Sequence, residues 1–332
     1  DEMARNNFMR YEIKYPPRGE VFDRNGEYLV QSKECYDLMA IRRDMPKAGF
    51  DTARLSRITG VTVEKLRRAF SAGRPRVGTL ILKYLSAEER LQIEEMGISG
   101  LYTIPRTVRQ YPRKIGGNLL GSVGEVSPRT IMENPYYSAG DYIGEQGIES
   151  AYENVLRGEK GIILRDIYAR GSERDTVIQA AVPGKSIVCT IDARLQQFAE
   201  ELMRGKVGAV VAIEPATGEI LVMASSPTFD PDELVGRDRG NNYMRELNQP
   251  RQPLFNRAVK SKYPPGSTFK LVNGLIGMQE GVLTTHNVYP CHRGYNFGKI
   301  HVGCHDHASP LGLHYAIATS CNAYFCYVFR NI

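Results

Sequence analysis

Residues 263–270 read Tyr-Pro-Pro-Gly-Ser-Thr-Phe-Lys, which places Ser267 three positions before Lys270. The chain continues with an apolar run to Gly281, which predicts a buried helix entered through a Pro-Pro-Gly turn. Residues three apart share a helix face, so the Lys270 amine can lie beside the Ser267 hydroxyl in the first turn. A serine needs a neighbouring base, and burial lowers the pKa of a lysine towards that role. The pair alone is a weak signal, but together with the Ser-x-Asn that follows about fifty residues later it indicates an enzyme whose serine is acylated.

A second polar cluster, Ser320-Cys-Asn322, lies in the apolar stretch 316–329. Polar side chains inside an apolar run need hydrogen-bond partners. Ser320 is suited to relay a proton between Lys270 and a leaving group, and the Asn322 amide can bond both Lys270 and a substrate carbonyl. The plain structural alternatives are a surface lysine on an amphipathic helix and a capping Ser and Asn. Together the two motifs favour a catalytic set of Ser267, Lys270, Ser320 and Asn322.

These motifs, with Leu254-Phe-Asn-Arg-Ala before them, resemble the elongation type of class B penicillin-binding proteins. The likeness covers nearly the whole chain. Arg18-Gly-Glu-Val-Phe-Asp-Arg-Asn-Gly resembles the start of the family's periplasmic pedestal. Gly144-Glu-Gln-Gly-Ile-Glu, followed by Tyr152-Glu-Asn-Val-Leu-Arg-Gly, resembles the segment that leads to the catalytic domain.

The resemblance implies a peptidoglycan D,D-transpeptidase that cross-links stem peptides during cell elongation and is acylated by β-lactams. Ser267 would attack the penultimate D-Ala carbonyl, with Lys270 as base, Ser320 as relay and Asn322 as amide donor. The Ser267 N–H would form part of the oxyanion hole. The resemblance also implies an anchor in the bacterial inner membrane, outside this chain, with the domains in the periplasm. The pedestal would bind elongation-complex membrane proteins, a glycosyltransferase and a scaffold.

One family element is missing from these residues. Penicillin-binding proteins and related β-lactamases carry a Lys-Thr-Gly tripeptide, and none occurs in the 332 residues. In the family it lies well beyond Ser-x-Asn, so we expect a fragment that is cut within its catalytic domain and is inactive alone. The alternatives are a non-catalytic scaffold fragment that docks a cell-shape partner, a β-lactamase and a division-type class B protein. A β-lactamase is disfavoured by the long region before the motifs.

The pattern predicts an α+β fold with two domains. Residues 1–185 are expected to form an elongated non-catalytic pedestal, and residues 186–332 the first part of a transpeptidase domain with helices on an antiparallel sheet. The expected elements are a hairpin of Glu20–Phe22 and Tyr28–Val30, helices at 51–59, 62–71, 86–96, 145–157 and 193–204, and strands at 186–191, 207–213 and 219–224. Ser86 and Glu89 predict a capping box.

Composition limits the class of partner. The net charge is +6, and 42% of the residues are hydrophobic, which suits domains with real cores. The basic pairs Arg42-Arg43 and Arg67-Arg68 are interpreted as solvated faces, so no nucleic-acid partner is expected. No apolar run approaches the ~20 residues that span a bilayer.

Six cysteines occur, and four of them flank or interrupt the Ser-x-Asn motif: Cys291, Cys304, Cys321 and Cys326. Cys291, Cys304, His307 and Cys321 offer three thiolates and an imidazole, a set suited to structural zinc. His305 is a competing fourth ligand, and His292 and His301 are less suited. Disulfides and buried free thiols are the alternatives. The family resemblance favours zinc, because some elongation-type members carry a zinc site beside the nucleophile; Cys326 is expected to face the core.

Overall fold

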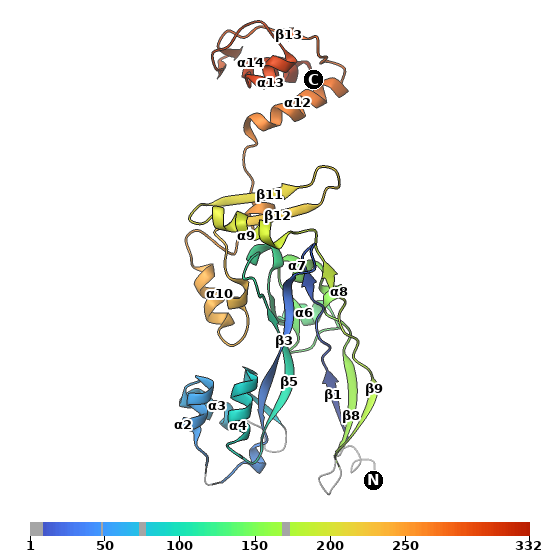
Figure 1. Ribbon diagram of the computed structural model, residues 1–332, viewed down its shortest axis with the longest axis vertical. Helices are drawn as coiled ribbons and strands as arrows, with labels where there is room; N and C mark the ends of the chain where they lie inside the picture. Colours follow the sequence, from blue (N-terminus) through green and yellow to red (C-terminus); the bar gives the residue numbers. More distant parts are fainter. Residues whose placement is uncertain (1–8, 48, 73–77, 168–172) are drawn as a thin grey trace. The chain divides into compact units, whose positions relative to one another are not determined.

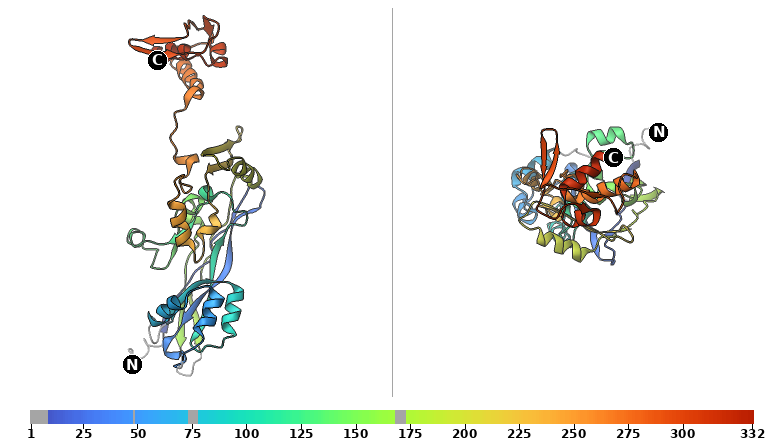
Figure 2. Two further views of the ribbon diagram at one scale, coloured as in Figure 1. Left: turned by 90° about the vertical axis from the view of Figure 1, so that its left-hand side faces the viewer. Right: turned by 90° about the horizontal axis from the view of Figure 1, so that it is seen from above.

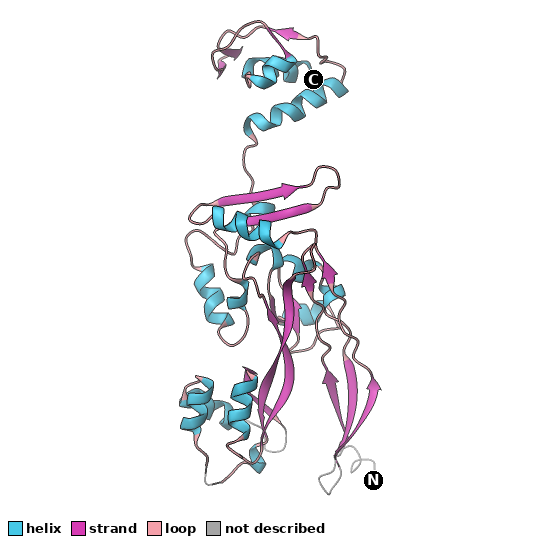
Figure 3. Ribbon diagram, viewed as in Figure 1, coloured by secondary structure: helices cyan, strands magenta, loops and turns pink. Residues whose placement is uncertain are grey.

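The structure is a computed structural model that describes residues 9–47, 49–72, 78–167 and 173–332 (Figure 1). The chain divides into two compact units, Asp1–Ser261 and Lys262–Ile332. Both units mix helices with small sheets (Figure 3), which confirms the α+β expectation. No described helix is long and apolar enough to cross a membrane.

The larger sheet of Asp1–Ser261 is built on one long strand, β3 (Tyr28–Ala40). β3 pairs antiparallel with β5 (Leu101–Gln110) from Gln31–Gln110 to Ala40–Leu101. It also pairs with β2 (Val21–Phe22) and β4 (Thr79–Leu85). The β2–β3 pair confirms the expected hairpin. Of the strand expected at 186–191, β10 (Ile187–Val188) alone forms, and it extends this sheet parallel to β2.

Three helices pack on one end of this sheet around Leu38, Leu55, Leu66 and Leu85, all fully buried. They are α2 (Thr52–Thr59), α3 (Val63–Ala72) and α4 (Ala87–Glu94), as the sequence predicts. The capping box of α4 is confirmed, since the Ser86 hydroxyl accepts from the Glu89 N–H and the Glu89 carboxylate accepts from the Ser86 N–H. A short 3-10 turn, η1 (Arg42–Asp44), links β3 to these helices.

A second antiparallel sheet consists of β1 (Met9–Lys14), β8 (Gly161–Ile167) and β9 (Glu173–Gln179), with β8 in the middle. Between the two sheets in sequence lie short elements: α5 (Gly117–Leu120), β6 (Val123–Glu125), α6 (Pro128–Glu133) and β7 (Tyr142–Gly144). The single helix expected at 145–157 is wrong. It is broken into α7 (Gly147–Ala151) and α8 (Glu153–Leu156), because Tyr152 leaves the helical region at φ −108°, ψ 23°.

The last part of this unit contains a helix on a two-stranded sheet. α9 (Ala193–Leu202) packs on β12 of the antiparallel pair β11 (Gly208–Ile213) and β12 (Ile220–Ser226), visible in Figures 1 and 2. The expected helix and strands are thus confirmed. The Asp192 carboxylate caps α9 by accepting from the N–H groups of Arg194 and Leu195. The remaining elements are η2 (Pro231–Leu234), α10 (Arg239–Leu247) and α11 (Arg257–Lys260).

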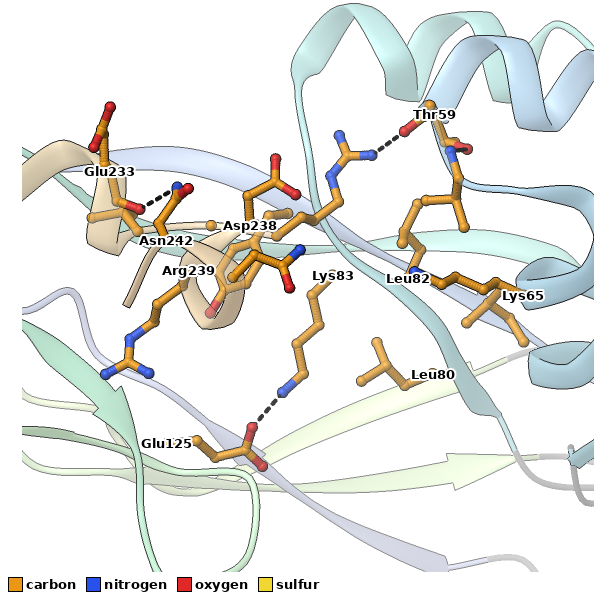
Figure 4. Close-up of a pocket in the computed structure, with 18 of the residues that line it drawn as sticks. Thr59, Lys65, Leu80, Leu82, Lys83, Glu125, Glu233, Asp238, Arg239 and Asn242 are labelled. Atoms are coloured by element: carbon orange, nitrogen blue, oxygen red, sulfur yellow. Dashed lines mark hydrogen bonds and ion pairs between the residues drawn. The ribbon is translucent and has the colours of Figure 1, made fainter. Parts of the chain in front are cut away.

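A cavity of about 960 Å³ lies where α2, α3, β4 and the η2–α10 segment meet. Lys83 pairs with Glu125 across it, Arg237 donates to the Thr59 carbonyl, and Asn242 donates to the Glu233 carbonyl (Figure 4). Arg237 also pairs with Glu89 of α4. These contacts join segments that are distant in sequence. We therefore interpret the cavity as a gap left where these segments pack together.

The unit Lys262–Ile332 contains η3 (Gly266–Thr268), α12 (Phe269–Gln279), α13 (Leu313–Ala318) and α14 (Asn322–Asn331). Two strand pairs accompany them: β13 (Val288–Tyr289) with β16 (Leu311–Gly312), and β14 (Gly294–Phe297) with β15 (Ile300–Gly303). α12 packs on α14, but its opposite face is open, with Leu275 68% exposed. The expectation that this helix is buried is therefore wrong within the described residues: α14 covers one face of α12, and the opposite face is left exposed.

Gly121 offers a test of how the α5 and α7 segments fit together. Its φ is +81°, and an added Cβ would overlap the carbonyl oxygen of Gln146. Gly140 is a matched control, because its φ is +93° and nothing lies within 4 Å of its missing Cβ. We expect Gly140→Ala to cost roughly 1–2 kcal/mol from the left-handed backbone alone, and Gly121→Ala to cost about 1–3 kcal/mol more. Urea unfolding midpoints measure both, and equal shifts would contradict the close approach.

Candidate active site

Ser267 lies in the 3-10 turn η3, immediately before α12, rather than in the first α-helical turn expected from the sequence. The turn begins at Gly266, whose φ is +60°, and the Thr268 hydroxyl braces it by donating to the Pro265 carbonyl at 2.6 Å. Ser267 is exposed. Among the described residues, its hydroxyl has no hydrogen-bond partner. The candidate nucleophile is therefore open to solvent on a braced turn.

Lys270 is the centre of the polar cluster. Its Nζ donates to the Ser320 hydroxyl at 3.0 Å, to Asn322 Oδ1 at 2.6 Å and to the Ser320 carbonyl. Burial lowers the pKa of Lys270, while the negative charges that Cys304, Cys321 and Cys326 carry as thiolates act in the opposite direction. A lowered pKa increases the neutral fraction of the amine at a given pH, which is the form that accepts a proton.

Ser320 and Asn322 flank the junction between α13 and α14. Ser320 has φ +53°, a left-handed conformation that is rare for a serine and costs free energy. Asn322 is the first residue of α14, and its Nδ2 donates to the Gly303 carbonyl at 2.8 Å. Because the amide nitrogen is engaged there, the amide oxygen is the atom that faces Lys270.

The structure thus brings three of the four predicted catalytic residues together: Lys270, Ser320 and Asn322. It does not place the Ser267 hydroxyl within hydrogen-bond distance of any of them. The sequence analysis did not predict two features of this site. The Gly303 carbonyl orients the Asn322 amide, and the strained backbone at Ser320 lets both its hydroxyl and its carbonyl reach Lys270. No residue pattern indicates the conformation of Ser320. The only signal for Gly303 is its position next to Cys304, a predicted metal ligand.

The four predicted metal ligands also meet. One ligand atom from each of Cys291, Cys304, His307 and Cys321 lies within 4.8 Å of the others. Cys304 Sγ is 3.4 Å from His307 Nε2, and His307 Nδ1 lies 2.9 Å from the Ala308 carbonyl. That second contact directs Nε2 towards the cluster, as is common for histidines that bind metals.

The electrostatics of the cluster suit a cation. Burial works against the Cys304 thiolate, but hydrogen bonds from His307 and from backbone N–H groups lower its pKa to about 6. Burial raises the pKa of Cys321 to about 12. Three thiolates packed this closely repel one another, and a bound dication offsets that repulsion. Three sulfurs and one imidazole match the donor set of structural zinc, so the residues fit the metal that the sequence suggested.

The competing readings of the cysteines can be compared with the structure. All six cysteines lie in its described part, and none forms a disulfide. His305 is exposed and outside the group of four. Cys326 is partly buried against the core, as expected. The cluster touches the catalytic residues directly, since the Asn322 N–H donates to Cys304 Sγ at 3.2 Å.

Comparison with known proteins identifies two domains, and the second of them spans the boundary between the two compact units. Residues 13–189 match the penicillin-binding protein dimerisation domain, and residues 208–332 match the penicillin-binding protein transpeptidase domain. The chain belongs to the penicillin-binding proteins.

This penicillin-binding protein is 30% identical over 285 residues to the peptidoglycan D,D-transpeptidase MrdA of Haemophilus influenzae, covering 81% of this chain and 43% of that protein. The MrdA of Escherichia coli K12 is 29% identical over 86% of this chain and 47% of its own length. The chain thus spans about half the length of these curated relatives. Such relatives place it with class B, in the penicillin-binding protein 2 type.

Solved structures of penicillin-binding proteins have a similar fold. One similar structure is a complex between penicillin-binding protein 2 and MreC from Helicobacter pylori. The matching chain in it is 22% identical in sequence and has a TM-score of 0.79. The match covers 98% of this chain and 63% of that chain. At that identity the likeness concerns the fold. A peptidoglycan synthase complex that coordinates polymerization and crosslinking contains a chain that is 30% identical. It matches 97% of this chain with 57% of its own length, at a TM-score of 0.70.

Proposed function

We propose that these residues are part of a peptidoglycan D,D-transpeptidase that cross-links stem peptides during cell elongation and is acylated by β-lactams. The observation that carries the proposal is the Lys270 amine, which bonds both the Ser320 hydroxyl and the Asn322 amide one turn after the exposed Ser267. The names of the curated relatives and the matched transpeptidase domain support it. The scaffold and β-lactamase alternatives are not favoured.

In the proposed reaction, Ser267 Oγ attacks the penultimate D-Ala carbonyl of a stem peptide. Neutral Lys270 accepts the hydroxyl proton as the C–O bond forms. Ser320, hydrogen-bonded to that amine, passes a proton to the departing amino group, so D-Ala leaves as an amine and an acyl-enzyme remains. The Ser267 N–H stabilises the tetrahedral oxyanion. An amine of a second stem peptide then attacks the ester, gives up a proton and restores Ser267.

The place and partners of the whole protein are part of the same proposal. We place it in the bacterial inner membrane through a single N-terminal anchor outside this chain, with both domains in the periplasm. The pedestal, residues 1–185, is proposed to bind a glycosyltransferase and a scaffold of the elongation complex. A related structure named as a complex with MreC, and another named as a synthase complex, support a partner of this kind.

Trypsin offers a direct test. Cleavage after Lys262 and Lys270 releases the peptide Tyr-Pro-Pro-Gly-Ser-Thr-Phe-Lys. A protein carrying the whole transpeptidase domain, incubated with a penicillin, is expected to gain one covalent adduct within this peptide, at Ser267 by fragmentation. A stable adduct supports a transpeptidase, and one that hydrolyses rapidly supports a β-lactamase. A protein that forms no adduct would favour the scaffold.

We also propose that Cys291, Cys304, His307 and Cys321 hold a structural zinc ion. Cys321 lies between Ser320 and Asn322, and Cys304 accepts from the Asn322 N–H. A metal bound here would fix the position of both side chains that bond Lys270. When bound, zinc would supply the charge that keeps the thiolates together and stabilise the fold of this unit.

The zinc proposal predicts that Cys304→Ser lowers the zinc content from about one ion per chain to well below half. Elemental mass spectrometry of the purified protein measures it. Cys326→Ser is the matched control, because Cys326 lies outside the ligand group, and it should keep its zinc. We also expect Cys304→Ser to lower the thermal unfolding temperature, because metal binding contributes directly to folding. Equal zinc content in the two variants, or an intact disulfide by non-reducing mass analysis, would contradict the proposal.

A further inference from the structure

Most of the net positive charge of the chain is concentrated on one segment. Residues 41–72, which contain η1, α2 and α3, have eight basic and three acidic residues and hence a net charge of +5, whereas the whole chain has +6. All eight basic residues are exposed. Five of them lie on the two helices and form what we call the α2–α3 basic face: Arg54, Arg57, Lys65, Arg67 and Arg68. The segment is therefore strongly cationic, and the rest of the chain is close to neutral.

The two helices direct their cations away from a shared core. Arg57 stands two positions after Leu55 in α2, and Arg68 stands two positions after Leu66 in α3. Two positions along a helix correspond to a turn of about 200°, so each arginine lies opposite its leucine. Leu55 and Leu66 are buried in the same core cluster, and α2 packs against α3. The outer sides of the two helices are therefore neighbours and form one basic surface (Figure 1).

The chain itself does not neutralise this surface. No ion pair of the five side chains of the α2–α3 basic face is found within the described residues. The three acidic residues of the segment lie elsewhere on it: Asp44 pairs with Arg43, Asp51 caps α2, and Glu64 is in the first turn of α3. Cations gathered on two short helices repel one another, so an anionic surface placed against them is attracted.

The neighbouring helix α4 has the opposite composition. It carries Glu88, Glu89 and Glu94 and a single arginine, Arg90. α2 packs against α4 as well as against α3. The charge on these three helices is thus segregated, and an anionic partner is attracted over α2 and α3 rather than over α4.

The position of the basic face within its unit indicates what it meets. α2 and α3 lie at the same end of Asp1–Ser261 as the start of β1, and α9 and β11 lie at the other end (Figures 1 and 2). The anchor in the proposed function precedes β1 in the chain. The basic face is therefore at the end of this unit that is nearest to the membrane.

We propose that the α2–α3 basic face docks on the anionic phospholipid headgroups of the membrane that holds the anchor. Clusters of about four to eight Lys and Arg beside a membrane anchor bind anionic lipid surfaces, because each cation is attracted to the negative surface potential. The sequence alone indicated solvated faces, and the structure adds their concentration on one surface at the anchored end. The proposal rests on the anchor in the proposed function and is independent of the acylation of Ser267.

Vesicle co-sedimentation tests the proposal, on a protein that carries the whole transpeptidase domain but no anchor. One set of vesicles is phosphatidylcholine alone, and the other is equal parts phosphatidylcholine and phosphatidylglycerol. We expect binding to the anionic vesicles only, and weaker binding as the salt concentration rises. The variant with Arg54, Arg57, Arg67 and Arg68 all replaced by Gln should bind the anionic vesicles at least about 10-fold more weakly.

The matched control removes four positive charges from the other end of the same unit. It replaces exposed Arg204, Lys206, Arg251 and Lys260 by Gln, so both variants have the same net charge. We expect the control to change vesicle binding less than about 2-fold, because its charges lie more than a Debye length from the docked surface. Unfolding midpoints of both variants should stay near that of the unchanged protein, since all eight side chains are on the surface.

Each outcome decides the proposal. Loss of binding in the α2–α3 variant alone supports it. Equal loss in both variants would mean that only net charge matters, and would overturn it. Equal binding to both kinds of vesicle, or to neither, would overturn it as well, and the second result would leave an acidic protein as the partner of this face. Penicillin labelling of Ser267 is measured separately, so the membrane contact can fail while the proposed function holds, and the reverse.

Discussion

Replacing Ser267 by alanine is expected to abolish covalent labelling by penicillin in a protein that carries the whole transpeptidase domain. The acyl-enzyme needs an oxygen that attacks the carbonyl, and alanine supplies none. Loss of an attacking serine in other enzymes lowers kcat by about 10⁶, so no adduct should form within hours. Intact-mass spectrometry measures the adduct. Folding should be unaffected, because Ser267 is exposed and its hydroxyl makes no hydrogen bond within the described residues.

Thr268→Ala is the matched control, because the threonine is adjacent and also carries a hydroxyl. That hydroxyl is already committed to the Pro265 carbonyl at 2.6 Å. Its loss should weaken the turn by about 1 kcal/mol while labelling persists. If Thr268→Ala removed the adduct and Ser267→Ala kept it, the nucleophile would be misassigned and the role of Lys270 with it.

The site could be predicted from the sequence to the extent that residue type and spacing determine it. The Ser-x-x-Lys and Ser-x-Asn motifs predicted the candidate catalytic residues. In the structure Lys270 contacts Ser320 and Asn322, although about fifty residues separate them in sequence. The orientation of the Asn322 amide could not be predicted, because it depends on a backbone carbonyl of a hairpin that is distant in sequence. Likewise, His307 and His305 are both near Cys304 in sequence, and the chain path decides which imidazole reaches the thiolates.

For the fold, elements with local signals were predicted and those with non-local causes were not. The Ser86 capping box and the periodicity of 193–204 depend on neighbours in sequence, and both are confirmed. Pairing of Ile187 with Val21 joins residues far apart and has no local signal. The break at Tyr152 separates Glu149 from Glu153, and both carboxylates then bind arginines that lie far away in sequence: Arg18 binds both, and Arg109 binds Glu149.

These ion pairs explain how two segments that resemble the family meet in the structure although they lie far apart in sequence. Arg18 Nε donates to Glu149 Oε2 at 2.6 Å, and Arg109 Nε donates to Glu149 Oε1 at 2.7 Å. Glu149 is 0% exposed. Burial alone would lower the pKa of Arg18, but the charges of Glu149 and Glu153 raise it overall, so the guanidinium stays charged. A carboxylate between two arginines thus links the first pedestal segment, β5 and α7.

Glu149→Gln is expected to destabilise this unit by about 3–5 kcal/mol, because it leaves the buried Arg109 without its carboxylate. Arg18 is affected less, since Arg18 Nη2 retains Glu153 at 2.6 Å. The control is Glu133→Gln, whose carboxylate pairs with Arg129 on the surface of α6 at 2.7 Å. An exposed i,i+4 pair of this kind contributes only about 0.3–0.5 kcal/mol. Unfolding followed by circular dichroism should show a clear drop in midpoint for Glu149→Gln alone. Similar midpoints for the two variants would mean that water reaches the buried arginine and compensates its charge.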